Sequence, residues 1–99
     1  MNQQMMMRIR KMQKELEQAQ KKLQETEFTG QAGGISTVVM NGKHEFLSVK
    51  ILPEAFESQE DIDMIEDSIL SAINDCNKQF EEAQAKILGP YASLGGGLF

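Results

Sequence analysis

The sequence predicts an α+β fold in which a long helix, a three-stranded antiparallel β-meander and a second long helix follow one another. Three observations support this order. Residues 3–27 lack glycine and proline and repeat apolar side chains every 3.5 positions. A β-branched segment ends at Asn41-Gly42, a strong hairpin signal. Helical periodicity then returns over residues 59–88.

The chain is short enough for one domain. Its 99 residues bury a modest core, and two long helices make the shape elongated. We expect a single α-β-β-β-α domain over residues 1–90. Residues 91–99 contain Gly95-Gly96-Gly97, and we expect them to form a flexible glycine-rich tail.

The first helix combines an apolar seam with positive charge. Its seam consists of Met5, Ile9, Met12, Leu16, Ala19, Leu23 and Thr26. Gaps of four and three residues alternate along it, as in a helix that packs lengthwise against another helix. Six of the ten basic residues of the chain lie in the same segment, namely Arg8, Arg10, Lys11, Lys14, Lys21 and Lys22. Heptad positions place Arg10, Lys14 and Lys21 on the side opposite the seam.

Charge is segregated along the sequence. Residues 1–24 carry six basic and two acidic side chains, a net charge of +4. Residues 25–52 carry two basic and three acidic, or −1, and residues 53–99 two basic and ten acidic, or −8, which gives the total of −5. Beyond about 8 Å in physiological salt these regions act almost independently. The basic residues either bind an anion or only keep the surface of a helix in contact with water, and the sequence leaves both interpretations open.

The middle of the chain reads as three strands. We expect them over residues 28–32, 35–40 and 43–52. Gly33-Gly34 predicts the first turn, and Asn41-Gly42 predicts a two-residue type I′ turn with both residues at positive φ. On the third strand Leu47, Val49 and Ile51 alternate with more polar residues, which indicates one covered face.

The second helix has a seam that changes width. It consists of Ile62, Ile65, Ile69, Ile73, Cys76, Phe80, Ala83 and Ile87. The first half is broad, which suits packing on a sheet, and the second is narrow, which suits one neighbouring helix. Ser58 with Asp61 resembles a capping box at the start, and Gly89-Pro90 ends the helix.

The sequence offers no constellation for catalysis. Its one histidine, His44, and one cysteine, Cys76, have no evident acid or base partner. We therefore expect no enzymatic activity, no cofactor, no metal site and no small-molecule substrate. A single cysteine excludes an intrachain disulfide and suits a reducing cytosol. The longest apolar runs are three residues and no signal peptide is evident, so we expect no membrane partner.

The order and spacing of several segments resemble the YbaB/EbfC family of bacterial nucleoid-associated proteins. The matching residues are Met5-Met6-Met7, Lys11-Met12-Gln13, Leu16, Leu23, Gly30, Gly33-Gly34, Asn41-Gly42, Val49, Ile51, Pro53, Asp61, Glu66-Asp67, Ala72 and Asn74-Asp75. They cover nearly the whole chain. No single one of these motifs is specific for the family, but their order and spacing together are.

The resemblance implies a tweezer-like homodimer that binds double-stranded DNA in the cytoplasm, at the nucleoid. It implies a contribution to nucleoid organisation and to gene regulation, without catalytic residues. Combined with the charge pattern, it gives the DNA-binding residues as Arg8, Arg10, Lys11, Lys14, Lys21 and Lys22. DNA sequence preference, the physiological process and whether the long helices pair within or between chains stay open.

A second function fits the same outline. Two long helices joined by β-hairpins also describe a coiled-coil scaffold or a prefoldin-like holdase that binds protein clients. Met5-Met6-Met7 at the helix end would then contact the client, because methionine surfaces adapt to varied partners.

Overall fold

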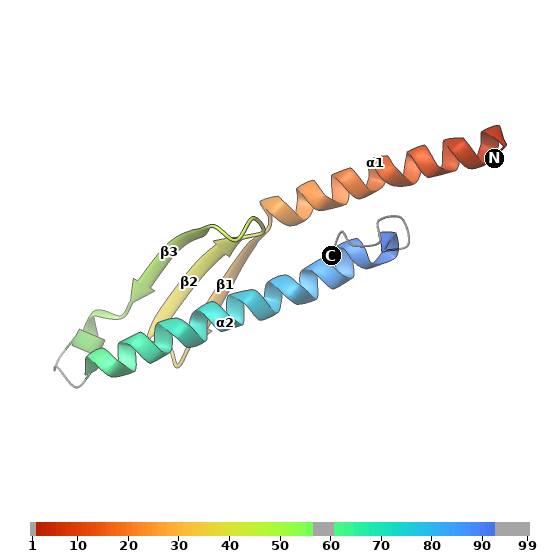
Figure 1. Ribbon diagram of the computed structural model, residues 1–99. Helices are drawn as coiled ribbons and strands as arrows, with labels where there is room; N and C mark the ends of the chain where they lie inside the picture. The colour runs from red at the N-terminus through yellow and green to blue at the C-terminus, as the bar shows by residue number, and fades with distance from the viewer. Residues whose placement is uncertain (1, 57–60, 93–99) are drawn as a thin grey trace.

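The computed structural model describes residues 2–56 and 61–92 and confirms the α+β order of elements (Figure 1). The elements are α1 (Gln3–Glu25), β1 (Glu27–Ala32), β2 (Ser36–Asn41), β3 (Phe46–Ile51), the 3-10 turn η1 (Pro53–Phe56), α2 (Asp61–Leu88) and the 3-10 turn η2 (Gly89–Tyr91). The strands form one antiparallel sheet in the order β1-β2-β3. The expected cap at Ser58 and most of the expected tail lie outside the described residues.

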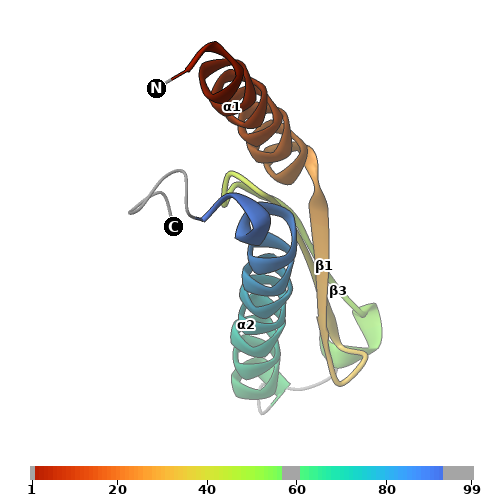
Figure 2. The ribbon, with the colours of Figure 1, turned by 90° about the vertical axis from the view of Figure 1, so that its right-hand side faces the viewer.

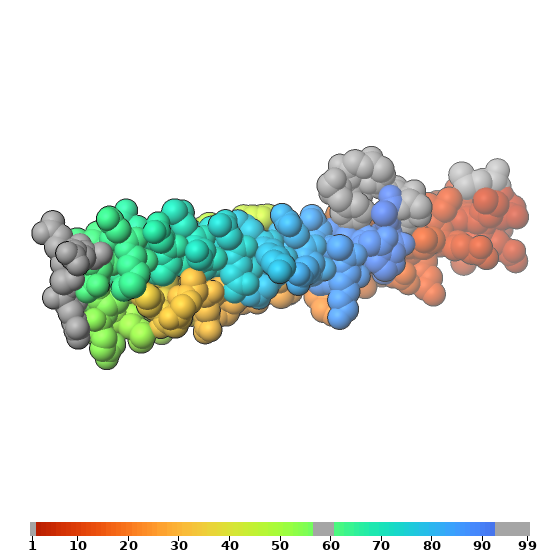
Figure 3. All heavy atoms as spheres, turned by 90° about the horizontal axis from the view of Figure 1, so that it is seen from below, coloured from red at the N-terminus to blue at the C-terminus, as the bar shows by residue number. Residues whose placement is uncertain are grey.

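The molecule is elongated, with principal extents of 70 × 18 × 15 Å. The first half of α2 packs on one face of the sheet, and its second half continues beside α1 (Figure 1). The first turns of α1 extend beyond the end of α2 (Figures 1 and 3). The division of α2 inferred from its seam is therefore confirmed, and the two helices pair within one chain. Neither helix, over the described ranges, has the length and apolar composition needed to cross a membrane.

One core connects the helices to the sheet. Phe28, Val38 and Met40 project from the sheet towards Ala72 and Cys76 of α2. The same cluster continues along the helices, where it contains Leu16, Leu23, Phe80 and Leu88. The rings of Phe28 and Phe80 meet edge to face with centroids 5.8 Å apart. The α1 seam thus shares a core with the sheet.

Capping interactions set the limits of α1. The Asn2 Oδ1 accepts a hydrogen bond from the Met5 backbone N–H at 2.8 Å and so caps the first turn. At the other end Thr26 is extended, with φ −74° and ψ 136°, and its hydroxyl donates to the Lys22 carbonyl at 2.7 Å. Thr26 therefore directs the chain straight into β1, and α1 ends at Glu25, short of the expected residue 27.

The α2 helix packs directly against the backbone of β1. A Cβ built on Gly30 would lie 2.1 Å from the Ala72 carbonyl oxygen and 2.8 Å from the Cys76 Sγ. The Cys76 thiol lies 3.3 Å from the Val38 carbonyl and 3.5 Å from that of Phe28, both of which it can donate to. Any residue other than glycine at this position would hold the helix away from the sheet.

The hairpin after β2 differs from the expected two-residue turn. Gly42 is not at positive φ; instead His44 is left-handed, with φ 64°. The His44 N–H donates to the Asn41 carbonyl at 3.1 Å, and the Asn41 Oδ1 accepts from the N–H groups of Lys43 and Glu45. Gly42 is required for another reason, since a Cβ there would lie 1.8 Å from the Leu23 carbonyl oxygen. The expected turn at Gly33 and Gly34 is confirmed, with φ of 59° and 71°.

The third strand is not covered as its alternation predicted. Leu47 and Val49 are 52% and 50% exposed. Figure 2 shows α2 lying along one face of the sheet. The cause of the exposure is that α2 packs mainly on β1 and β2 rather than on β3. Val49 and Ile51 lie opposite the buried Val38 and Ser36, on one face as predicted. The prediction is wrong for Leu47, because an irregularity of the register between Val39 and Met40 sets Phe46 opposite the buried Met40 instead.

Replacing Gly30 by alanine tests the close approach of α2. We expect Gly30→Ala to lower the free energy of unfolding by about 1–3 kcal/mol, because the new Cβ forces the helix and the strand apart. Chemical denaturation monitored by circular dichroism measures the change. Gly89→Ala is the matched control, since nothing lies within 4 Å of a Cβ there. Equal stability of the two variants would contradict the packing described.

Candidate nucleic-acid interface

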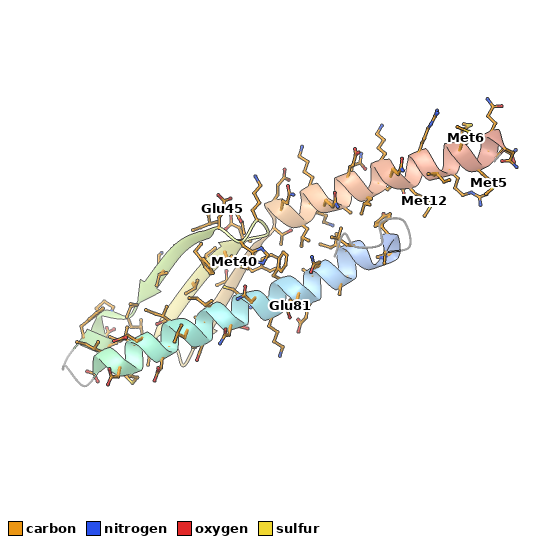
Figure 4. All side chains as sticks on the ribbon, in the orientation of Figure 1. Met5, Met6, Met12, Met40, Glu45 and Glu81 are labelled. Carbon is orange, nitrogen blue, oxygen red and sulfur yellow. The ribbon has the colours of Figure 1, made fainter. Side chains whose placement is uncertain are left out.

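The six basic residues predicted from sequence share one helix and are all exposed. From Arg8 to Lys22 they span about 21 Å of α1, given a rise of about 1.5 Å per residue. Figure 4 shows nitrogen-tipped side chains projecting from the side of α1 that faces away from α2. The structure therefore brings these cations together along one rod, which is long enough to meet several phosphates.

The orientation of this row follows from the buried seam. Leu16 and Leu23 are the two buried residues of α1 and mark its packed side. Lys14 and Lys21 each precede one of these leucines by two residues, which is about 200° around the helix. Arg10 lies one turn before Lys14 on the same exposed side. Packing of the seam thus aims this part of the row at solvent.

The basic side chains are not neutralised by the protein itself. None of the six forms an ion pair with another residue across ranges 2–56 and 61–92. Ion pairs with acidic residues one turn away on the helix would have neutralised part of this charge. The full charge of the row is therefore available to an external anion.

The structure adds a cation that sequence reasoning did not include. Gly42 touches the backbone of Leu23, so the hairpin loop is held beside the end of α1. The next residue, Lys43, is exposed and belongs to this loop, which puts one more cation near the carboxyl end of α1. Lys43 and Lys22 are 21 residues apart in sequence, so the sequence pattern does not show that Lys43 lies near α1. Only the steric requirement for glycine at position 42 could have indicated it.

Acidic side chains occupy a different surface. Exposed acids follow one another along α2, namely Asp63, Glu66, Asp67, Glu81 and Glu82. Because like charges repel a phosphate backbone, this surface disfavours nucleic acid. The molecule therefore presents one basic rod and one acidic rod.

The remaining reactive side chains have structural roles. The His44 ring packs on Phe80, with centroids 4.2 Å apart. Cys76 is fully buried, and burial raises the pKa of its thiol. The negative charge of Asp75 also raises this pKa, whereas a hydrogen bond with the Gly30 backbone lowers it. Residues 2–56 and 61–92 contain neither a pocket nor a group of three potential metal ligands.

Together these features define a small α+β protein with an exposed basic helical arm and no cavity for chemistry in its described part. The chain belongs to the YbaB/EbfC DNA-binding family, whose profile matches residues 1–96.

Relatives and a solved structure extend this similarity. The chain is 39% identical to a nucleoid-associated protein of Clostridium kluyveri, over 95% of this chain and 80% of that protein. It is 40% identical to a nucleoid-associated protein of Saccharopolyspora erythraea, over 96% and 83% respectively. The crystal structure of an uncharacterized protein from Helicobacter pylori matches with a TM-score of 0.66 and 28% identity, over 96% of this chain and 99% of that one.

The burial of Cys76 gives a direct test of the packing near the site. We expect the native protein to react slowly with a disulfide reagent such as DTNB at mildly alkaline pH, because the buried thiol resists ionisation. The rate should rise to that of a free thiol when denaturant unfolds the chain. Absorbance of the released thiolate follows the reaction, and rapid stoichiometric labelling of the native protein would contradict the structure.

Proposed function

We propose that this protein is a nucleoid-associated protein that binds double-stranded DNA as a homodimer through the basic face of α1. The observation that supports it most is the row of exposed, unpaired cations on α1 opposite the buried Leu16 and Leu23. Membership of a DNA-binding family and the names of the relatives favour the same function.

The proposed mechanism is neutralisation of backbone phosphates. Each lysine or arginine that meets a phosphate releases condensed counterions, so binding is strong at low salt and weakens steeply as salt rises. Such contacts position a protein on a duplex and carry little sequence information. The acidic side of α2 turns away from DNA, which leaves α1 as the contacting rod.

A dimer would strengthen this interaction. Two copies related by a two-fold axis present two basic rods, and linked contacts bind more tightly than separate ones. Coverage of the chromosome by such dimers would contribute to nucleoid organisation and, where promoters are occupied, to gene regulation. The proposed location is the nucleoid, and the proposed role requires no catalysis.

A pair of lysines on α1 tests the site. We expect Lys14→Gln with Lys21→Gln to weaken binding to a duplex at every salt concentration. In a dimer four charges are lost, so the slope of log K against log salt should become shallower by up to about 3–4. Fluorescence anisotropy with a labelled duplex at several salt concentrations measures both effects.

The matched control is Lys78→Gln with Lys86→Gln. These lysines are also exposed and lie about two helical turns apart, eight residues against seven for the α1 pair, but they belong to the acidic α2. The control should retain most of the affinity and the slope. Absence of duplex binding by the unaltered protein at low salt would refute the function, whereas equal loss in both variants would refute the site.

One observation favours a second candidate function, the holding of unfolded protein clients. Met5, Met6 and Met7, in the first turns of α1, are 49%, 42% and 64% exposed. Figure 4 shows Met5 and Met6 at the end of α1 that extends beyond α2. A flexible apolar tip suits varied client segments. The basic row has no role in that function, so we rank it second.

Serine replacements at the tip separate the two functions. We expect Met5→Ser, Met6→Ser and Met7→Ser together to leave duplex affinity within about twofold, because neutral side chains contribute nothing to counterion release. Suppression of client aggregation, followed by light scattering, is the second readout. Suppression by the unaltered protein that disappears in this variant would favour the holdase.

A further inference from the structure

We infer that Met7 inserts as an apolar wedge between two neighbouring base pairs of a bound duplex and bends the DNA at that step. Met7 is the most exposed large apolar side chain in the described part of the chain, at 64%. The packing of α1 against α2 does not account for an apolar residue at this position. The inference rests on the DNA binding proposed above and adds to it a second kind of contact.

Met7 belongs to the row of cations rather than to the seam. It precedes Lys14 by seven residues, which is about 700° around the helix and so within about 20° of the same direction. It precedes the buried Leu16 by nine residues, or about 900°, which places it half a turn away on the opposite side. The side of α1 that presents Lys14 and Lys21 to a duplex therefore begins with an exposed methionine.

Four exposed side chains surround Met7, and each can donate hydrogen bonds. On a helix the neighbours of a residue lie three and four positions away in either direction. For Met7 these neighbours are Gln3, Gln4, Arg10 and Lys11. Glutamine amides and cationic groups donate to phosphate oxygens and to the acceptor atoms of base edges. Met7 is thus the apolar centre of a polar and cationic rim.

The charge of this end of α1 favours a nucleic acid as the partner. Residues 2–14 contain no aspartate or glutamate and carry four cations, namely Arg8, Arg10, Lys11 and Lys14. None of these cations forms an ion pair with a residue that the structure describes. A duplex presents phosphates on both sides of each groove, whereas an apolar protein segment has no charge to neutralise them. The first turns of α1 also extend beyond the acidic α2, which therefore does not cover them (Figure 1).

Methionine has the properties that a wedge requires. Its side chain is unbranched, flexible and polarizable, so it adapts to a narrow space and packs well against an aromatic surface such as a base. Apolar side chains inserted between base pairs unstack them partly and kink the duplex by roughly 20–90°. Arg10 and Lys11 lie one turn from Met7, where they hold the phosphates that border the opened step.

The wedge gives the protein a preference among duplexes. Pyrimidine–purine steps such as TA kink and unstack easily, whereas A-tracts are stiff. Insertion therefore favours DNA with TA steps, although no base edge needs to be read. Phosphate contacts alone carry little such information. A bent duplex is also more compact, which connects the contact of one side chain with nucleoid organisation.

Serine replacement of Met7 tests the wedge through the shape of the bound DNA. A short duplex with a central TA step carries a fluorescence donor at one end and an acceptor at the other. We expect the unaltered protein to raise the energy transfer at saturation, because bending brings the ends together, and Met7→Ser to lose most of this rise. Affinity should change by no more than about twofold, since the lost insertion contact and the avoided unstacking oppose each other.

Two further variants make the test specific. Met5→Ser changes the same residue type near the same end of α1, but Met5 precedes Leu16 by eleven residues, or about 1,100°, and lies on the seam side. This variant should bend the duplex as the unaltered protein does. Met7→Leu keeps an apolar side chain and should retain the bending. Circular dichroism checks that all three variants keep their helices.

A fluorescent base locates the unstacking. Aminopurine placed at the central step becomes brighter when it loses its stacked neighbours. Its emission should rise on binding of the unaltered protein and of Met5→Ser, and should stay low with Met7→Ser. A duplex with an A-tract at its centre should show a smaller rise, because its steps resist opening.

Anisotropy of the same labelled duplex separates this inference from the proposed function. Binding without added energy transfer, or equal bending by Met7→Ser and the unaltered protein, overturns the wedge and leaves the DNA-binding function standing. Loss of bending in Met5→Ser and Met7→Ser alike also overturns the role of Met7, because the effect then belongs to the helix end as a whole. Absence of binding at low salt refutes the proposed function and the wedge with it.

Discussion

The direct contact between α2 and the backbone of β1 governs the rest of this structure. With glycine at position 30, the Ala72 carbonyl and the Cys76 thiol come closer to the strand than a side chain would permit. This contact places α2 over β1, where the Asp75 carboxylate accepts a hydrogen bond from the Gln31 N–H and the Gln79 side chain donates one to the Thr29 carbonyl. With α2 held over β1 and β2, β3 is left largely outside the helix contact.

The two ends of the molecule then differ in character. The sheet and the first half of α2 form the packed end, and α1 carries the exposed row of cations. The hairpin loop connects the two ends, because Gly42 lies against Leu23 while His44 packs on Phe80. The direction of the arm thus depends on a loop of the sheet. An acidic chain can bind DNA on these terms, since its negative charge lies on α2 and its positive charge on α1.

Much of the fold could be predicted because it depends on local patterns. Helix periodicity, β-branched runs and the positive φ of Gly33 and Gly34 act between residues close in sequence. The basic row could be found for the same reason, since one helix carries all six residues. Lys43 could not, because its position beside α1 results from a packing contact between distant segments. The turn at Asn41 and Gly42 was mistaken because tertiary packing, rather than φ, requires that glycine.

The sequence by itself determined the order of elements, the seam of α1 and the separation of charge, since each follows from residue type and spacing. Only the tertiary structure decided which strand α2 covers, and hence which edge stays open. Alternation on β3 placed Val49 and Ile51 on one face, but it missed the irregularity that sets Phe46 opposite Met40 and could not say how far this chain covers that face. Burial depends on what lies opposite in space. Val49 stays half exposed because α2 packs on β1 and β2 rather than on β3.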